Sequence, residues 1–190
     1  FDGQSLLGMA PHEINQAGVS RVFQTPEIFG DLNLIDNVMI PSFARRDGAF
    51  KINAWTPVRR NGPMAEKAMA MLEDVGLAAK ADETAAHLSR GDKRRLELAM
   101  CLVQDPKLLL LDEPTAGMAR ADTNNTIDLM KTISQRGVTM VVIEHDMHVV
   151  FSLAEKISVL AQGTVIAEDT PENIKGNPKV QEAYLGGAHL

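Results

Sequence analysis

A run of four leucines followed by two acids constrains the fold of this chain more than any other feature. The run is Leu108–Leu111, and Asp112 and Glu113 follow it directly. A short continuous apolar run is typical of a strand that is buried on both faces of a parallel sheet. In open α/β sheets, ligands bind at the carboxyl ends of the strands, so we expect the two carboxylates at a ligand-binding edge.

Carboxylates at such an edge suit two chemical tasks. One can hold Mg²⁺ through water, and its neighbour can orient or deprotonate an attacking water molecule. The alternative for Asp112 and Glu113 is a strand end with two solvated acids. The run from Pro114 to Gly117 that follows them favours the chemical interpretation.

The remaining hydrophobic pattern predicts an α/β layer joined to a helical part. From residue 105 onward the expected order is strand, helix, strand, helix and hairpin, whereas residues 25–104 are expected to be almost wholly helical. Pro and Gly residues predict a loop over 41–62. The expected strands are 19–23, 108–111, 138–143 and a hairpin of 156–160 with 164–168, and the expected helices are 31–40, with Asp31 or Asn33 as its cap, 63–75, 91–103, 121–135, 147–154, 171–175 and 178–185.

Composition excludes several classes of protein. The chain has 190 residues, of which 45% are apolar, and this fraction excludes disorder. A single cysteine, Cys101, excludes a disulfide scaffold, and its apolar surroundings predict a core position. No apolar run reaches the roughly 18 residues of a membrane helix. The net charge of −6 argues against a nucleic-acid surface.

The charge is distributed unevenly along the chain. Residues 41–62 contain five basic residues and one acid, Asp47, which gives a local charge of 5 − 1 = +4. A solvated loop explains this stretch, and so does a surface that docks on a membrane protein or on lipid headgroups. The basic residues are Arg45, Arg46, Lys51, Arg59 and Arg60.

His145 follows the second apolar strand, and three interpretations of it remain open. A histidine at this sheet edge can hydrogen-bond a γ-phosphate. It could instead belong to a metal site with Glu144, Asp146 and His148, although the spacing matches no zinc pattern. The third interpretation is a capping cluster in front of the next helix, which suits Asp146.

A short segment and one glutamine are further candidates for a binding site because of their place in the chain. Ser89, Arg90 and Gly91 precede a helix, whose free N–H groups and dipole favour an anion. An ordinary serine N-cap is the alternative there. Gln24 joins the first strand to the helical part, and it is a candidate for contact with Mg²⁺ or water.

Together these motifs resemble those of the ATP-binding cassette (ABC) ATPases. Gln24 corresponds to the Q-loop, Leu88–Asp92 to the family signature, Leu108–Glu113 to the Walker B strand and His145 to the switch histidine. The chain is most similar to the ATPase subunits of branched-chain amino-acid importers and of urea importers. This finer resemblance rests on Arg21–Gln24, Asn37-Val38, the basic stretch 41–62, Ala116–Met118, Glu144–Met147 and the tail from Asn177 to Gly186.

The resemblance implies an α/β fold, namely a P-loop NTPase lobe of the ABC, RecA-like type with a mainly helical subdomain. Residues 1–24 would be part of the ATPase core lobe and end in the Q-loop. Residues 25–104 would form the helical subdomain with the signature motif. Residues 105–190 would complete the core lobe with Walker B, the switch histidine, the hairpin and the last helices.

The resemblance also implies a function and a set of roles. The chain would be the ATP-binding and ATP-hydrolysing subunit of an importer for branched-chain amino acids or a similar small solute, with ATP and Mg²⁺ as cofactors. Asp112 and Gln24 would hold Mg²⁺, partly through water. Glu113 would be the general base, and His145 would contact the γ-phosphate. The signature residues Ser89, Arg90 and Gly91 would bind the phosphates held by a second subunit.

The implied partners are a second ABC ATPase subunit, in a homodimer or a heterodimer, and membrane permease subunits, with no nucleic acid. The implied location is the cytoplasm, peripherally on the inner face of the cell membrane. A non-transport ABC ATPase of DNA repair or translation is an alternative, but it predicts a long coiled coil or a basic nucleic-acid face. A binding-only fragment without turnover is a second alternative.

The chain also departs from the family pattern. None of its 14 glycines precedes a lysine, so the family's phosphate loop, G-x-x-x-x-G-K-[ST], is absent from these residues. We therefore expect an N-terminally truncated chain that exposes apolar surface, self-associates, and by itself binds ATP weakly without hydrolysing it. Arg90 and Asp92 replace the usual glycine and glutamine of the signature. Ala119 stands where many members have an aspartate that contacts the partner.

Overall fold

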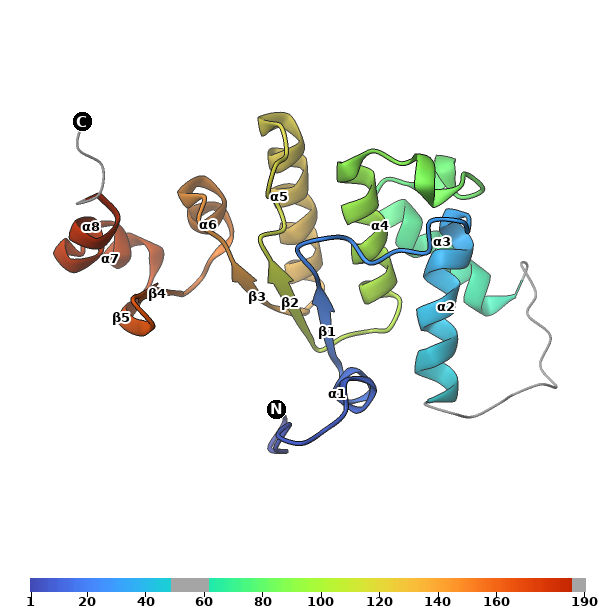
Figure 1. Ribbon diagram of the computed structural model, residues 1–190, viewed down its shortest axis with the longest axis horizontal. Coiled ribbons are helices and arrows are strands. Elements are labelled where there is room, and N and C mark those ends of the chain that lie inside the picture. The colour runs from blue at the N-terminus through green and yellow to red at the C-terminus, as the bar shows by residue number, and fades with distance from the viewer. Residues whose placement is uncertain (49–61, 186–190) are drawn as a thin grey trace. The chain divides into compact units, whose positions relative to one another are not determined.

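The computed structural model describes residues 1–48 and 62–185, with side chains up to residue 183, and it divides into two compact units (Figure 1). The first unit covers residues 1–143 and the second begins at Glu144. The elements of the first unit are α1 (Pro11–Ala17), β1 (Val19–Val22), α2 (Leu34–Asp47), α3 (Pro63–Asp74), two 3₁₀ turns (Ala78–Lys80 and Ala85–His87), α4 (Arg90–Leu102), β2 (Leu108–Asp112), α5 (Arg120–Gln135) and β3 (Thr139–Ile143).

The sheet of the first unit is parallel, as the apolar runs predict. Its strand order is β1-β2-β3, so β2 lies in the centre. Val22 of β1 is in register with Leu111, and Asp112 is in register with Ile143 of β3. The carboxyl ends of all three strands therefore meet at one edge, which is where the two acids lie.

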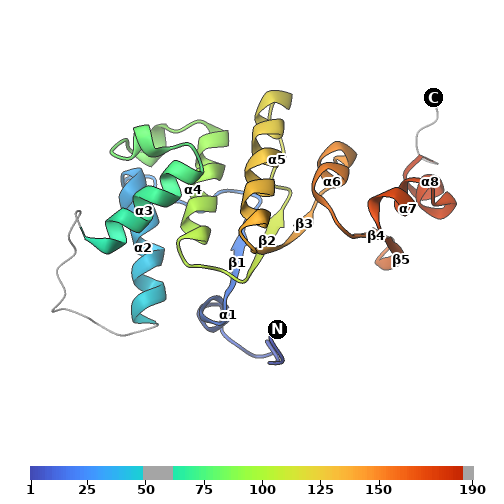
Figure 2. The ribbon, with the colours of Figure 1, turned by 180° about the vertical axis from the view of Figure 1, so that it is seen from behind.

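One face of this sheet is covered and the other is largely open. Helix α5 runs along the covered face (Figure 2), where Leu109 is fully buried and Leu111 is 3% exposed. On the opposite face Val141 is 50% exposed and Ile143 is 61% exposed. The prediction of strands covered on both faces is thus wrong for β3, because alternate side chains point to opposite faces and α5 covers only one of them.

The helical part of the first unit packs around a core of its own. Helix α2 begins after Asn33, whose side chain accepts a hydrogen bond from the backbone N–H of Asp36 at 2.9 Å, so Asn33 is the cap of the two residues considered. The described elements between residues 25 and 104 are helices and 3₁₀ turns, as predicted. Their fully buried members include Leu34, Val38, Ala68, Leu72, Leu96 and Val103.

Two local predictions at the start of the chain are wrong. Helix α1 was not expected, and α2 continues through Pro41 to Asp47 where a loop was expected. The two helices support each other, because Arg45 Nη1 donates to the carbonyl of Gln16 at 2.5 Å and Gln16 Nε2 donates to the carbonyl of Ala44 at 2.8 Å. These tertiary contacts outweigh the hydrogen bond that proline removes from a helix. Lys51, Arg59 and Arg60 of the basic stretch lie outside the described residues.

Cys101 on α4 occupies a core position, as predicted. It is 7% exposed, and its Sγ lies 3.5 Å from the carbonyl oxygen of Arg21. Burial raises the pKa of its thiol to about 12.

We therefore expect the native thiol of Cys101 to resist modification. The thiolate is the reactive form, so the native protein should react with Ellman's reagent at least about a hundredfold more slowly than the denatured protein. Stopped-flow absorbance with and without urea measures both rates. Equal rates would show that the thiol is accessible in the folded chain.

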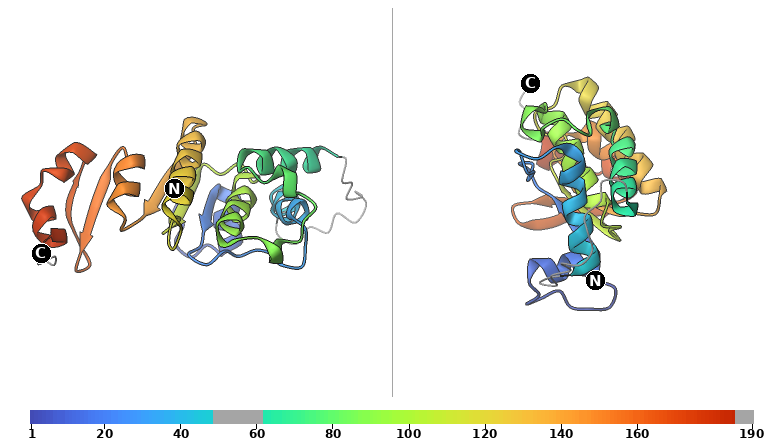
Figure 3. Two further views of the ribbon diagram at one scale, coloured as in Figure 1. Left: turned by 90° about the horizontal axis from the view of Figure 1, so that it is seen from above. Right: turned by 90° about the vertical axis from the view of Figure 1, so that its right-hand side faces the viewer.

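The second unit consists of a hairpin with helices on both sides of it in sequence (Figure 3). Strands β4 and β5 pair antiparallel, as predicted, and Gln162 and Gly163 both have positive φ in the turn between them. Its core contains Ile157, Val159, Ile174 and Val180. The elements are α6 (Met147–Leu153), β4 (Ile157–Ala161), β5 (Thr164–Asp169), α7 (Pro171–Lys175) and α8 (Pro178–Leu185). Across the described part of the chain, none of the helices is long and apolar enough to cross a membrane.

Candidate functional site

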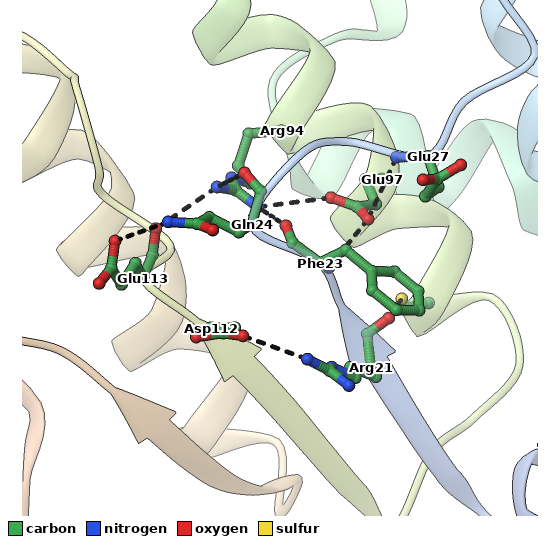
Figure 4. Close-up of polar contacts among 9 residues, drawn as sticks. Arg21, Phe23, Gln24, Glu27, Arg94, Glu97, Asp112 and Glu113 are labelled. Carbon is green, nitrogen blue, oxygen red and sulfur yellow. Dashed lines mark hydrogen bonds and ion pairs between the residues drawn. The ribbon is translucent and has the colours of Figure 1, made fainter.

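Asp112 ends the central strand and pairs with an arginine from the neighbouring strand. Its Oδ2 accepts a hydrogen bond from Nη2 of Arg21 on β1 at 3.1 Å (Figure 4). The Arg21 guanidinium also lies 4.9 Å from the centre of the Phe23 ring. The Arg21 and Asp112 side chains are 53% and 31% exposed, so water screens their attraction. The carboxylate of Asp112 is therefore accessible to another cation.

Glu113 leaves the strand with a backbone conformation that is unusual for glutamate. Its φ is +45°, in the left-handed region, and its backbone N–H donates to the carbonyl of Ile143 at 2.9 Å. A non-glycine residue in this region is uncommon and costs about 1 kcal/mol or more. The surrounding structure must therefore stabilise Glu113 in this conformation, and such outliers cluster at functional sites.

Gln24 lies beside Glu113. Its Nε2 donates to Glu113 Oε2 at 3.1 Å, although 88 residues separate the two in sequence (Figure 4). Because the amide nitrogen faces Glu113, the amide oxygen of Gln24 remains available to a water molecule or a metal ion. The structure thus brings together two of the residues that the sequence proposed for one site.

Helix α4 contacts the backbone on both sides of this pair. Arg94 is 6% exposed, and its guanidinium donates to the carbonyl oxygens of Phe23, of Gln24 at 2.8 Å and of Glu113 at 3.4 Å. Glu97 is 3% exposed, and its Oε1 accepts from the backbone N–H groups of Phe23 at 3.1 Å and Glu27 at 3.4 Å. Sequence reasoning missed Arg94 and Glu97 because their partners are main-chain groups, most of them 70 or more residues away.

Burial raises the pKa of Glu97, although the N–H groups of Phe23 and Glu27 and the charge of Arg94 act in the opposite direction. A carboxyl whose pKa is higher in the folded state binds its proton more tightly there. The free energy of unfolding therefore falls as the pH rises from the ordinary value of about 4.5 toward the raised pKa.

We expect Glu97→Gln to remove this dependence. The difference in unfolding free energy, wild type minus variant, should decrease as the pH rises above about 4.5. Urea unfolding at several pH values measures it. Glu66→Gln, on the exposed face of α3, is the control for the substitution itself. A wild-type advantage that grows with pH would contradict the raised pKa.

The signature segment begins α4 in the way that an N-cap requires. Ser89 Oγ accepts a hydrogen bond from the backbone N–H of Asp92 at 3.1 Å. The carboxylate of Asp92 lies 2.7 Å from Lys80 Nζ and 3.8 Å from Arg95 Nη1. The capping interpretation of Ser89 is therefore correct, and it is compatible with anion binding because the first turn retains other N–H groups.

Arg90, the first residue of α4, lies against the loop that follows β2. A Cβ atom at Gly117 would lie 2.9 Å from Nη1 of Arg90, closer than real contacts allow. Gly117 also has a φ of +70°, which favours glycine. The loop after the acids thus accommodates the large side chain that replaces the usual signature glycine.

His145 belongs to the second unit and follows β3 by two residues. Its backbone N–H donates to Glu144 Oε2 at 3.2 Å. Asp146 caps α6 by accepting from the N–H of His148 at 2.8 Å, which confirms the capping role proposed for it. Within the described ranges, no three His, Cys, Asp or Glu side chains are grouped to hold a metal ion, so the four-residue metal site is not supported.

Comparison with known proteins identifies the family. The family model for ABC transporters matches residues 1–116, more than half of the chain. The chain belongs to the ABC transporter family. A second model, for branched-chain amino acid ATP-binding cassette transporters, matches residues 164–190 of this ABC chain.

Curated relatives extend this identification over nearly the whole chain. The chain is 37% identical to the high-affinity branched-chain amino acid transport ATP-binding protein BraF of Pseudomonas aeruginosa, over 99% of this chain and 75% of BraF. It is 36% identical to the protein of the same description, LivG, of Escherichia coli K12, over 97% of this chain and 74% of LivG.

Solved structures confirm the predicted fold class. An ATP-binding cassette of an ABC transporter in its ADP conformation has a TM-score of 0.80 and 28% identity, over 98% of this chain and 75% of that one. A nucleotide-free cassette has a TM-score of 0.76 and 27% identity, over 97% of this chain and 75% of that one. The fold of this ABC chain is therefore that of the ATP-binding cassettes.

Proposed function

We propose that this chain is the ATP-binding and ATP-hydrolysing subunit of an importer for branched-chain amino acids or a similar small solute. The observation that carries the proposal is the 3.1 Å hydrogen bond between Gln24 and Glu113 at the carboxyl edge of the sheet. It places an amide and a carboxylate where a water molecule could be oriented and deprotonated. The names of BraF and LivG support the class of solute.

Asp112, Glu113 and Gln24 have different proposed roles at this edge of the sheet. Asp112 would hold Mg²⁺ through water, and the amide oxygen of Gln24 would contribute a second oxygen ligand. When bound, Mg²⁺ and ATP supply charge neutralisation and the phosphoryl group of the reaction. Glu113 accepts the proton of the attacking water, and Gln24 keeps its carboxylate in position.

The signature residues act on a second subunit. The N-terminus of the 13-residue helix α4 would present Ser89 and Gly91 to the triphosphate bound by the partner, and Arg90 would add a positive charge. His145 is proposed to contact the γ-phosphate. Its position two residues after β3, whose last residue is in register with Asp112, supports this role.

The proposed assembly contains two ATPase subunits, identical or different, on membrane permease subunits. We propose residues 1–24 and 105–190 as the ATPase core and residues 25–104 as the helical subdomain that faces the permease. The core around Leu34, Leu72 and Leu96 supports a separate helical subdomain. This arrangement places the chain peripherally on the inner face of the membrane.

Uptake by cells tests the proposed function. Cells that carry Glu113→Gln in the gene that encodes these residues should lose most of their high-affinity uptake of radiolabelled leucine, isoleucine and valine. Uptake of an unrelated solute such as glucose should not change. Normal uptake of all three amino acids in cells that lack related transporters would overturn branched-chain amino acids as the solute.

A further inference from the structure

We propose that Arg94 and Glu97 are positioning residues that tie the Gln24–Glu113 pair to helix α4. Their side chains fix the backbone on either side of Gln24, so that its contact with Glu113 depends on where the signature helix lies. The inference rests on the proposed function, because it concerns the same site. It assigns no contact with nucleotide to either residue.

Arg94 contacts both segments of chain that contain Gln24 and Glu113. Its guanidinium reaches the carbonyl oxygens of Phe23, Gln24 and Glu113, which belong to two segments of chain that contain the two reacting side chains (Figure 4). The guanidinium is planar and carries its donors in a fixed fork, so three carbonyls bound to one fork are held in one mutual arrangement. A movement of α4 therefore acts on both segments.

Glu97 contacts the same Q-loop backbone as Arg94, but through its N–H groups. One turn along α4 from Arg94, it accepts the N–H groups of Phe23 and Glu27, so the two side chains hold the Q-loop backbone by its donors as well as by its acceptors. Its Oε2 makes no hydrogen bond, but it lies 3.6 Å from Nη1 of Arg94. Burial of an ion pair is costly, and removal of one partner leaves a buried charge without compensation.

The next residue on α4, Arg95, is an arginine that is less buried than Arg94. Arg95 is 26% exposed and has a long 3.8 Å ion pair with Asp92 on its own helix. It therefore provides a matched control, because it has the same residue type and lies on the same helix as Arg94.

The test uses Arg94→Lys in the assembled transporter. Lysine keeps a positive charge beside Glu97, so the carboxylate is not left uncompensated, but one ammonium cannot reproduce the three-carbonyl fork. We expect kcat for ATP to fall about tenfold with KM unchanged, because a displaced catalytic group slows the reaction without weakening binding. Arg95→Lys should stay within about twofold of wild type.

A double-mutant cycle shows whether Arg94 acts through Gln24. Gln24→Ala should lower kcat in the wild-type background and lower it little further in the Arg94→Lys background. Backbone hydrogen exchange over residues 23–27 should become faster in Arg94→Lys. Glu97→Gln weakens the acceptor of the Phe23 and Glu27 N–H groups and removes the charge that compensates Arg94, so this second variant should show the same faster exchange and lower kcat.

Three outcomes are decisive. Reduced kcat with unchanged KM, faster exchange and non-additivity with Gln24→Ala supports the inference. Wild-type kcat in Arg94→Lys and Glu97→Gln, or full additivity with Gln24→Ala, overturns the inference and leaves the proposed function intact. A wild-type transporter without ATPase activity overturns the proposed function itself.

Discussion

Glu113→Gln in the assembled transporter is expected to lower kcat for ATP hydrolysis by at least about a hundredfold, because general acid–base catalysis contributes about 10²–10⁴ to such rates. The amide cannot accept the proton of the attacking water. Affinity for Mg²⁺-ATP should be retained, because the substitution removes a negative charge near the triphosphate. Steady-state phosphate release and equilibrium binding of a fluorescent ATP analogue measure the two quantities.

An exposed glutamate serves as the control for this variant. Glu172→Gln, in the first turn of α7, should keep wild-type kcat and KM. A Glu113→Gln protein with at least half of the wild-type kcat would show that Glu113 is not the general base. Loss of nucleotide binding together with hydrolysis would instead indicate a structural role.

Asn37→Ala is expected to destabilise the fold strongly, although asparagine is not an apolar core residue. Asn37 is fully buried, and its Oδ1 accepts from the N–H of Phe29 at 2.8 Å. Its Nδ2 donates to the carbonyl oxygens of Phe29 at 3.0 Å and Asn33 at 2.9 Å. Alanine would remove the acceptor of the Phe29 N–H and one of the two hydrogen bonds that each carbonyl accepts, at a cost of about 3 kcal/mol.

Urea unfolding followed by circular dichroism measures this cost as a shift of the midpoint at unchanged slope. For a chain of this size the melting temperature should fall by roughly 10 °C. Asn125→Ala, at an exposed position of α5, should change the unfolding free energy by less than about 0.5 kcal/mol. A cost below about 1 kcal/mol for Asn37→Ala would show that water replaces the amide.

Features that depend on neighbouring residues in the sequence could be predicted. The central strand with its two acids, the hairpin, and the caps Asn33, Ser89 and Asp146 all follow from residue type and local order. The caps are local because their hydrogen bonds close within a few residues. The hairpin joins adjacent strands. The central strand is recognised from its apolar run, although its ladder partners lie in β1 and β3. Local order therefore suffices for much of the fold class.

Features that depend on tertiary contacts could not be predicted. The ion pair of Arg21 with Asp112 needs the strand order, which periodicity does not reveal. The second half of α2 persists beyond Pro41 because α1 supports it. The exposed side chains of Val141 and Ile143 on β3 agree with the expectation of exposed apolar surface, although an apolar run alone does not reveal how many layers cover a strand.

The candidate site was predicted unevenly for the same reason. The proximity of Gln24 and Glu113 was expected from the family resemblance, and the 3.1 Å hydrogen bond agrees with it. Arg94 and Glu97 were missed because they bind main-chain groups, and residue types do not indicate which main-chain groups a side chain will meet. The roles proposed for Ser89, Arg90, Gly91 and His145 depend on a second subunit and a bound nucleotide.

The most direct test of this account is a cryo-electron microscopy structure of the assembled transporter that carries Glu113→Gln and is trapped with Mg²⁺-ATP. We predict that Asp112 faces the Mg²⁺, that Gln24 lies beside the attacking water, and that Ser89 and Gly91 contact the γ-phosphate bound by the other subunit. A nucleotide bound away from the carboxyl edge of β2, or a signature helix that contacts no phosphate, would contradict the account.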